Sequence, residues 1–227
     1  GIIVNVDKCV GCHACAIACK EENQVAPGIF YERVERFENI AANFINWFRV
    51  SCMHCDKPAC MPVCPVKAIH RGPAGEVLVD QKKCIGCRMC ERACPYGAPK
   101  FNASGETNYF GGKTPLAIRE LEPWQRHAAG RAEHCTLCTH RTSQGRPPAC
   151  VEACGIGAMT WVDFDAPAPE AEKLIAAAKP MNAAAGTEPK IRYVGDIWMR
   201  LQCLLASKVF GFENLRPQIG RICGAEY

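Results

Sequence analysis

The stretch "CIGCRMCERACP" (residues 84–95) decides the fold, because it spaces four cysteines as C-x2-C-x2-C-x3-C and follows them with a proline. The chain has 227 residues, and 18 of them are cysteines. Sixteen of the 18 fall into four groups of four, named here quartets one to four in chain order. The quartets are Cys9, Cys12, Cys15 and Cys19; Cys52, Cys55, Cys60 and Cys64; Cys84, Cys87, Cys90 and Cys94; and Cys135, Cys138, Cys150 and Cys154.

Quartet three has the spacing with which bacterial ferredoxins hold a [4Fe–4S] cluster. Thiolates two residues apart let one tight loop bind three corners of the cubane, while the fourth cysteine binds a neighbouring cluster. Gly11 and Gly86 lie inside such loops, where positive φ and close backbone approach are needed. Backbone N–H groups of these loops can point at the sulfurs and stabilise their negative charge. We expect a short helix to start at the fourth cysteine of each quartet.

Quartet four has a second interpretation when it is taken alone. Cys135-x2-Cys138 followed by Cys150-x3-Cys154 is also compatible with a zinc site of four thiolates. Thiolates suit both zinc and iron–sulfur clusters, but zinc does not need the CxxCxxC triplets found in quartets one and three. The triplets therefore favour clusters, and a multi-zinc structural module is kept as an alternative.

The chain also contains an internal repeat of two motif types. "VNVDKCVGCHAC" (4–15) matches "VLVDQKKCIGCRMC" (77–90), since each joins a short apolar strand, an aspartate and a cysteine triplet. The segments 52–64 and 135–154 share CxxC, a polar or proline-bearing insertion, and CxxxC. A two-cluster ferredoxin needs two quartets that exchange their last cysteines. Four quartets therefore predict two such units and four clusters.

Composition and motifs exclude several classes of function. The chain is 48% hydrophobic and 22% charged, its net charge is +4, and it has no run of basic residues typical of a nucleic-acid binder. No signal peptide is visible and no apolar run is long enough to span a membrane, so we expect neither. Because no hydrolase, zinc-protease or nucleotide-binding motif occurs, we expect no catalytic residue in this chain.

Little regular secondary structure is expected between the quartets. Prolines at its start and just beyond its end predict a helix over 169–179. Glycines and prolines predict that residues 100–133 form an inserted irregular loop. Runs of apolar and β-branched residues predict four short strands. These strands are 2–6, 76–80, 159–164 and 191–194.

The segment from Ile197 to Phe212 has apolar residues at helical spacing. It predicts an amphipathic helix that packs on its own domain, on a partner subunit or on a membrane surface. Cys203 and Cys223 lie in or after this segment without a second cysteine nearby. We therefore expect them to be buried thiols and not ligands.

With the quartets in place, the chain resembles the four-cluster electron-transfer (beta) subunits of the complex iron–sulfur molybdoenzyme, or dimethyl sulfoxide reductase, family. The resemblance covers residues 1–195 and includes all sixteen cysteines of the quartets. The stretches "PYGAPKFN" (95–102) and "KPMNAAAGTEPKIRYV" (179–194) look most like the arsenate respiratory reductase and polysulfide reductase branch.

The resemblance implies how the quartets are paired. Quartet one exchanges its last cysteine with quartet four, and quartet two exchanges with quartet three. No ligand of the pattern is missing, so four [4Fe–4S] clusters are expected. Their implied ligands are Cys9, Cys12, Cys15 and Cys154 for cluster 1; Cys135, Cys138, Cys150 and Cys19 for cluster 2; Cys52, Cys55, Cys60 and Cys94 for cluster 3; and Cys84, Cys87, Cys90 and Cys64 for cluster 4.

The expected fold class is α+β, with two nested ferredoxin-like units of two clusters each. Residues 1–51 and 100–165 form the outer unit and hold quartets one and four. Residues 52–99 form the inner unit and hold quartets two and three. Residues 166–227 form a C-terminal tail of helix and strand that docks a partner.

The resemblance implies a subunit that relays single electrons for anaerobic respiration. Its partners would be a large catalytic subunit carrying molybdopterin or tungstopterin and a redox partner such as a quinone-reactive membrane protein or a cytochrome. A free polyferredoxin that serves several oxidoreductases is the alternative. The clusters would be assembled in the cytoplasm, where the protein stays or from which it is exported folded with its partner to the periplasm or the membrane surface.

Two details of the sequence add expectations. Basic residues crowd quartet three, so we expect cluster 4 to have one of the higher reduction potentials. Gly155 follows Cys154, and Lys20 follows Cys19, whereas prolines follow the last cysteines of quartets two and three. This difference groups the quartets as outer and inner pairs, in the same way as the implied exchange.

The basic residues that crowd quartet three are Lys82, Lys83, Arg88 and Arg92.

Overall fold

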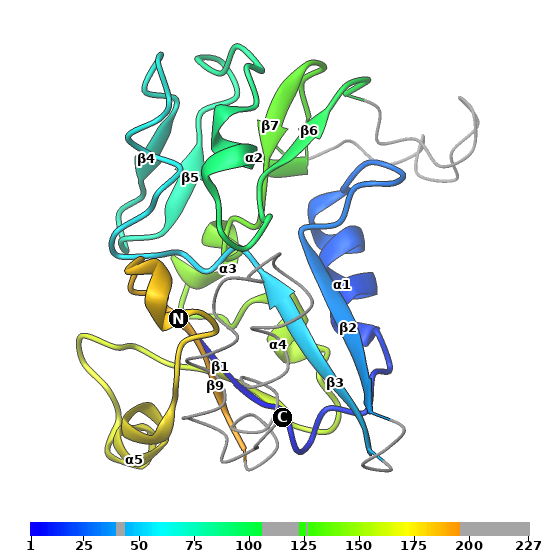
Figure 1. Cartoon of the computed structure of the whole chain (residues 1–227), viewed down its shortest axis with the longest axis vertical. Helices are drawn as coiled ribbons and strands as arrows, with labels where there is room; N and C mark the ends of the chain where they lie inside the picture. Colours follow the sequence, from blue (N-terminus) through cyan, green and yellow to red (C-terminus); the bar gives the residue numbers. More distant parts are fainter. Residues whose placement is uncertain (40–43, 106–122, 126, 196–227) are drawn as a thin grey trace, which may run out of the picture.

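Strand β1 (Ile2–Asn5) is the centre of the largest sheet in the computed structural model, which describes residues 1–39, 44–105, 123–125 and 127–195. It pairs antiparallel with β8 (Met159–Trp161), with Ile3 opposite Thr160, and parallel with β9 (Ile191–Val194). The N-terminal strand is therefore joined to segments about 160 and 190 residues away. The mixture of helices and strands confirms the α+β class (Figure 1).

The side chains of β1 are buried on both faces of the sheet. Ile2 and Val4 pack into the main core, which also contains cysteines of the quartets. Ile3 packs on the opposite face, against Leu174 and Ile175 of helix α5 (Pro169–Ala177). Cover on both faces is why this strand is an unbroken apolar run and does not alternate with polar residues.

Strands β2 (Glu32–Asn39) and β3 (Phe44–Ser51) form the longest hairpin in the described residues. Helix α1 (Ala14–Asn23) lies beside β2 (Figure 1). Sequence analysis did not predict this hairpin. Its strands carry charged residues at buried positions, which hide the alternating pattern by which strands are recognised.

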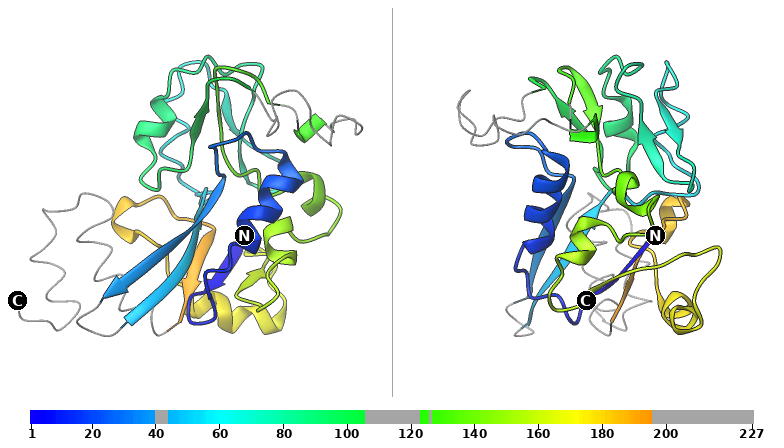
Figure 2. Two further views of the ribbon diagram at one scale, coloured as in Figure 1. Left: turned by 90° about the vertical axis from the view of Figure 1, so that its right-hand side faces the viewer. Right: turned by 180° about the vertical axis from the view of Figure 1, so that it is seen from behind.

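The smaller elements gather at the opposite end of the molecule (Figures 1 and 2). Strands β4 (Ile69–Arg71) and β5 (Val77–Val79) form one hairpin there, next to helix α2 (Met89–Ala93). Strands β6 (Lys100–Asn102) and β7 (Arg131–Glu133) pair with each other. The prediction of an irregular loop over 100–133 was therefore wrong at both ends of that segment.

Four strands and one helix of the sequence prediction are confirmed, as β1, β5, β8, β9 and α5. Helix α1 continues past Cys19 as expected, but the helices of quartets three and four were placed wrongly. Helix α2 and helix α4 (Ala149–Glu152) end before Cys94 and Cys154, and a turn and then a strand follow those cysteines. The short helix thus carries the third cysteine of the quartet. Further short elements are α3 (Thr139–Thr142), η2 (Pro123–Gln125) and η3 (Ala183–Ala185).

The predicted amphipathic helix from Ile197, with Cys203 and Cys223, lies outside the described residues. Within the described ranges, no helix combines the length and the apolar character that crossing a membrane requires.

Candidate metal centres

Three small cavities in the protein are each walled by four cysteines. They are similar in size, and they are named here the quartet-one, quartet-two and quartet-three cavities. Each is lined by three cysteines of one quartet and the last cysteine of another. The sets are Cys9, Cys12, Cys15 and Cys154; Cys52, Cys55, Cys60 and Cys94; and Cys84, Cys87, Cys90 and Cys64.

The remaining four predicted ligands also lie close together. Helix α1, which carries Cys19, contacts helix α4, which carries Cys150. Burial raises the pKa of the Cys19 thiol well above its usual value, and the nearby thiols of Cys135, Cys150 and Cys138 raise it further. Asn23 donates a hydrogen bond to the Sγ of Cys19 at 3.7 Å. These four cysteines are called the quartet-four set.

The loops that begin the four quartets share one backbone feature. The second residue after the first cysteine has a positive φ in every case, and two of these residues are not glycine. This conformation turns backbone N–H groups inward: Gly86 donates to the Sγ of Cys84 at 3.4 Å, and Leu137 donates to the Sγ of Cys135 at 3.3 Å. The four residues are Gly11, His54, Gly86 and Leu137.

Burial makes most of these thiols reluctant to ionise. It raises the pKa of Cys52 to about 11 and the pKa values of Cys55 and Cys135 to about 12. A thiol in such surroundings becomes a thiolate only when a cation offsets the cost of desolvation. The donor set of soft sulfur atoms therefore fits an iron–sulfur cluster, whose iron supplies that positive charge.

The spread of the cysteines is also informative. In the part of the chain that the structure describes, no three His, Cys, Asp or Glu side chains gather closely enough to hold a metal ion. The cysteines surround the cavities instead, an arrangement in which each thiolate would bind a different iron of one cluster.

Exposure differs between the ends and the middle of the cysteine array. Cys12 and Cys87 are exposed, so the quartet-one and quartet-three cavities reach the surface. All four cysteines of the quartet-four set are buried, and those of the quartet-two cavity are buried or partly exposed. Successive hydrophobic clusters connect the four sets through the core. The first group of packed apolar residues contains Cys15, Cys55 and Cys150. The second group contains Cys19, Cys52 and Cys135, and the third contains Cys60, Cys64, Cys84 and Cys90.

Sequence analysis did not predict one buried ion pair that lies near these sites. Arg49 on β3 and Glu32 on β2 are buried, and the Nε of Arg49 lies 2.7 Å from the Oε2 of Glu32. Arg49 lines the quartet-one cavity and also donates to the Sγ of Cys150 at 3.7 Å. No local signal marks either residue, because both look like solvent-facing charges of a strand.

Comparison with known proteins agrees with this geometry. Residues 43–109 and 116–164 match a family model described as a 4Fe-4S dicluster domain, and they include quartets two, three and four. The arsenate respiratory reductase iron-sulfur subunit ArrB of Shewanella sp. is 33% identical over 225 residues, covering 86% of this chain and 95% of that protein. The B subunit of selenate reductase from Mesobacillus selenatarsenatis is 35% identical, covering 85% and 70%. The B subunit of anaerobic dimethyl sulfoxide reductase from Escherichia coli is 32% identical, covering 84% and 86%.

Proposed function

Because the protein belongs to the 4Fe-4S dicluster family that includes the iron–sulfur subunits of molybdoenzyme reductases, we propose that it relays single electrons to or from a catalytic subunit. A bound [4Fe–4S] cluster supplies reversible one-electron chemistry. The protein supplies thiolate ligands, N–H donors and burial, which together set the potentials. The observation that carries the proposal is the set of cavities that are each walled by four cysteines.

The proposed complement is four [4Fe–4S] clusters. The quartet-one, quartet-two and quartet-three cavities would hold clusters 1, 3 and 4, and the quartet-four set would hold cluster 2. The four-cysteine lining of each cavity and the recurrent N–H to sulfur hydrogen bonds support the same type of cluster in each place.

Two nested units would hold these clusters. The antiparallel pair β1–β8 and the contact between α1 and α4 support an outer unit from residues 1–51 and 100–165. The quartet-two and quartet-three cavities support an inner unit from residues 52–99. The outer unit is extended by β9, which belongs to the proposed tail of residues 166–227.

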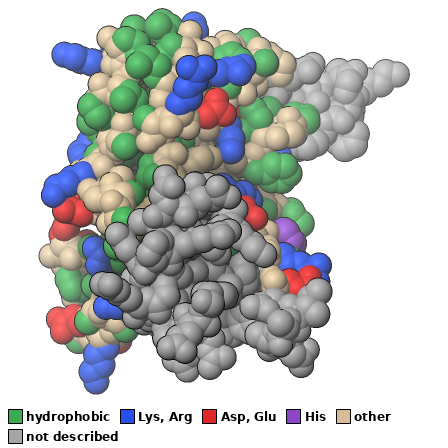
Figure 3. All heavy atoms as spheres, viewed as in Figure 1, with side chains coloured by type: hydrophobic (Ala, Val, Ile, Leu, Met, Phe, Trp, Pro, Cys, Tyr) green, Lys and Arg blue, Asp and Glu red, His purple; other side chains and the backbone are tan. Residues whose placement is uncertain are grey.

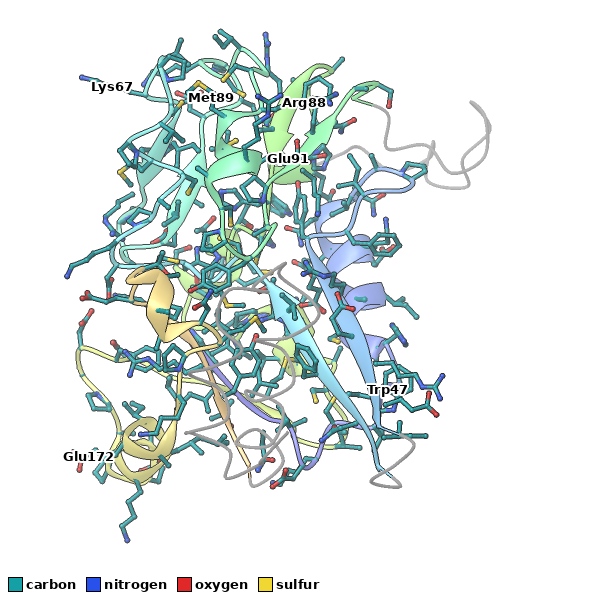
Figure 4. The ribbon with its side chains drawn as sticks, in the orientation of Figure 1. Trp47, Lys67, Arg88, Met89, Glu91 and Glu172 are labelled. Carbon is teal, nitrogen blue, oxygen red and sulfur yellow. The ribbon has the colours of Figure 1, made fainter. Side chains whose placement is uncertain are left out.

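Electrons would enter and leave at the two exposed ends of the array. Val10 and Ile156 form an apolar rim beside Cys12 in the quartet-one cavity. At the other end, Ile85 and Met89 are exposed, and each is two residues from Cys87 in the sequence (Met89 is labelled in Figure 4). Apolar rims of this kind exclude water from a contact with a partner and bring a cluster close to its redox partner.

The partners would be a catalytic subunit with molybdopterin or tungstopterin and a second redox protein, such as a membrane anchor or a cytochrome. The names of the similar iron–sulfur subunits support a reductase complex. The compartment would be the cytoplasm, or the periplasm after export of the folded protein with its partner.

Anaerobic purification of the native complex tests this proposal. We expect about sixteen iron and sixteen sulfide per chain, together with molybdenum or tungsten in a larger subunit. Zinc in place of iron would refute the proposal. A monomer with clusters but without either pterin metal would instead support a free polyferredoxin.

The ligand pairing has a sharper test. Cys154→Ser and Cys12→Ser should alter the same electron paramagnetic resonance (EPR) signal, because both residues line the quartet-one cavity. Cys19→Ser should alter the signal of a different cluster. If Cys154→Ser and Cys138→Ser altered one common signal, quartet four would keep its own fourth cysteine and the proposed exchange would be wrong.

A further inference from the structure

Arg49 places one guanidinium group between two of the proposed cluster sites. Its side chain is 2% exposed. It forms part of the wall of the quartet-one cavity, and its Nη2 lies 3.7 Å from the Sγ of Cys150 in the quartet-four set. The same positive charge therefore faces sulfur ligands of two different clusters.

The position of this guanidinium is set by contacts from two other strands. Glu32 accepts a hydrogen bond from the Nε of Arg49 at 2.7 Å, and the side chain of Glu32 is only 1% exposed. The hydroxyl of Tyr193 on β9 donates to the backbone carbonyl of Arg49 at 2.9 Å. Among the described residues, the Nη1 of Arg49 has no hydrogen-bond partner. A buried N–H group beside a cavity is thus left available for a sulfur atom.

Glu32 brings a negative charge to the same place. Its Oε2 lies 2.7 Å from the Nε of Arg49, which lines the quartet-one cavity and donates to the Sγ of Cys150. The ion pair therefore presents a positive and a negative group to the same two sites. Removing Arg49 should therefore change the reduction potentials at both sites in one direction, and removing Glu32 should change both in the other direction.

Burial makes these charges effective. Surface charges are screened by water and salt, whereas a charge in the interior acts through a lower effective dielectric constant. Burying an ion pair is costly, and an apolar pair of similar size is often as stable. Stability alone therefore does not explain why these two charges are buried here, whereas their electrostatic effect on the neighbouring sites does.

We propose that Arg49 raises the reduction potentials of clusters 1 and 2 together, and that Glu32 limits the size of this effect. The inference depends on the proposed function, since it requires both clusters. A reduced cluster carries one more negative charge, so a neighbouring cation and N–H donors to sulfur favour reduction. One shared charge would shift the potentials of two adjacent centres in the same direction, so it raises both without adding an uphill step between them.

The test uses the full chain, purified anaerobically with its bound subunits, and potentiometric EPR titration. We expect Arg49→Gln to lower two of the four midpoint potentials. A tenfold change in each reduction equilibrium corresponds to about 59 mV for a one-electron couple. Glu32→Gln should raise the same two potentials, and Arg49→Lys, which keeps the charge, should shift them by less than half as much.

A matched control lies on the same hairpin. The Nη2 of Arg36 is 2.8 Å from the Oε2 of Glu38, and these side chains are 50% and 39% exposed. Arg36→Gln and Glu38→Gln make the same charge changes at the surface, so they should leave all four potentials unchanged. They show whether a shift comes from the buried pair or from net charge.

Two outcomes would overturn the inference while leaving the proposed function intact. In the first, each variant retains about sixteen iron per chain but no midpoint potential moves. In the second, Arg49→Gln and Glu32→Gln shift the potentials in the same direction, as expected if the pair only holds the hairpin in place. An iron content far below sixteen in the unmodified chain would count against the proposed function itself. If Arg49→Gln fails to assemble, Glu32→Gln and Arg49→Lys still decide the question.

Discussion

The backbone N–H of Ala158 donates a hydrogen bond to the Sγ of Cys154 at 3.3 Å. The N–H of Ala68 donates to the Sγ of Cys64 in the same way, at 3.2 Å. In both turns the residue before the alanine has positive φ, 61° at Gly157 and 51° at Lys67. The turn after Cys154 is therefore the same as the turn after Cys64, although glycine replaces proline in the first position.

This equivalence predicts that a proline will be accepted after Cys154. Gly155 has no atoms within 4 Å of the place where a side chain would begin, and its φ lies outside the left-handed region. Gly155→Pro removes the N–H that donates to the carbonyl oxygen of Ala153 at 3.0 Å. Proline also restricts the unfolded chain, which offsets this loss, so the melting temperature should change little. Gly157→Ala is the contrasting variant, and its positive φ should cost about 1–2 kcal/mol. Thermal unfolding followed by circular dichroism measures both, and a large loss in Gly155→Pro would contradict the shared turn.

Gly86→Ala should prevent the quartet-three loop from closing. A Cβ at this position would lie 2.1 Å from the carbonyl oxygen of Gly130, which is backbone and cannot move aside cheaply. We expect the variant to lose the four iron atoms of one cluster, measured as iron per chain. Gly28→Ala is the control, because Gly28 also has positive φ but has no atoms within 4 Å. Full iron content in Gly86→Ala would contradict the prediction, and an equal loss of iron in both variants would show that backbone strain, and not the contact with Gly130, decides the result.

A buried histidine predicts a dependence of stability on pH. Burial alone would lower the pKa of His127, but its hydrogen bond to Glu133 outweighs burial and raises it. Because the folded pKa is raised, the stabilisation is fully present below the unfolded value of about 6.5 and is lost as pH rises through the folded pKa. The melting temperature should therefore fall over this range. Glu133→Gln should remove that part of the fall, and an unchanged pH profile in the variant would contradict the assignment.

Exposed basic residues should shift the reduction potential of cluster 4 less than Arg49 shifts the potentials of clusters 1 and 2. Lys83 is 64% exposed and pairs with Asp80 at 3.4 Å. The guanidinium of Arg88, which is labelled in Figure 4, lies 3.8 Å from the centre of the Phe101 ring. Lysine and arginine side chains are visible at this end of the surface (Figure 3). Replacing Lys83 and Arg88 by alanine should lower the potential of one cluster at low salt. The shift should vanish near 1 M salt, where screening is strong, while the Arg49→Gln shift persists.

Local sequence was sufficient to select the candidate ligands and to predict much of the scaffold around them. The cysteine spacing marks the sixteen candidate ligands because a cluster-binding loop is a local structure that a few residues can specify. Strands β1 and β9 were predicted for the same reason, since each is a short apolar run. The helix at 169–179 was predicted from its prolines and is observed as α5.

Tertiary structure alone determined which residues meet across long separations. Arg49 reaches Cys150 from 101 residues away, and the β2–β3 hairpin that carries Arg49 buries charges that ordinarily face water. A charged residue in a strand predicts an exposed position unless its partner is known, and Glu32 becomes that partner only when the hairpin has closed. The positions and the spacing of the cysteines are therefore determined by the sequence alone. The buried charge between two cysteine sets depends on strand pairing, because low dielectric and a fixed counter-charge exist only in the folded core.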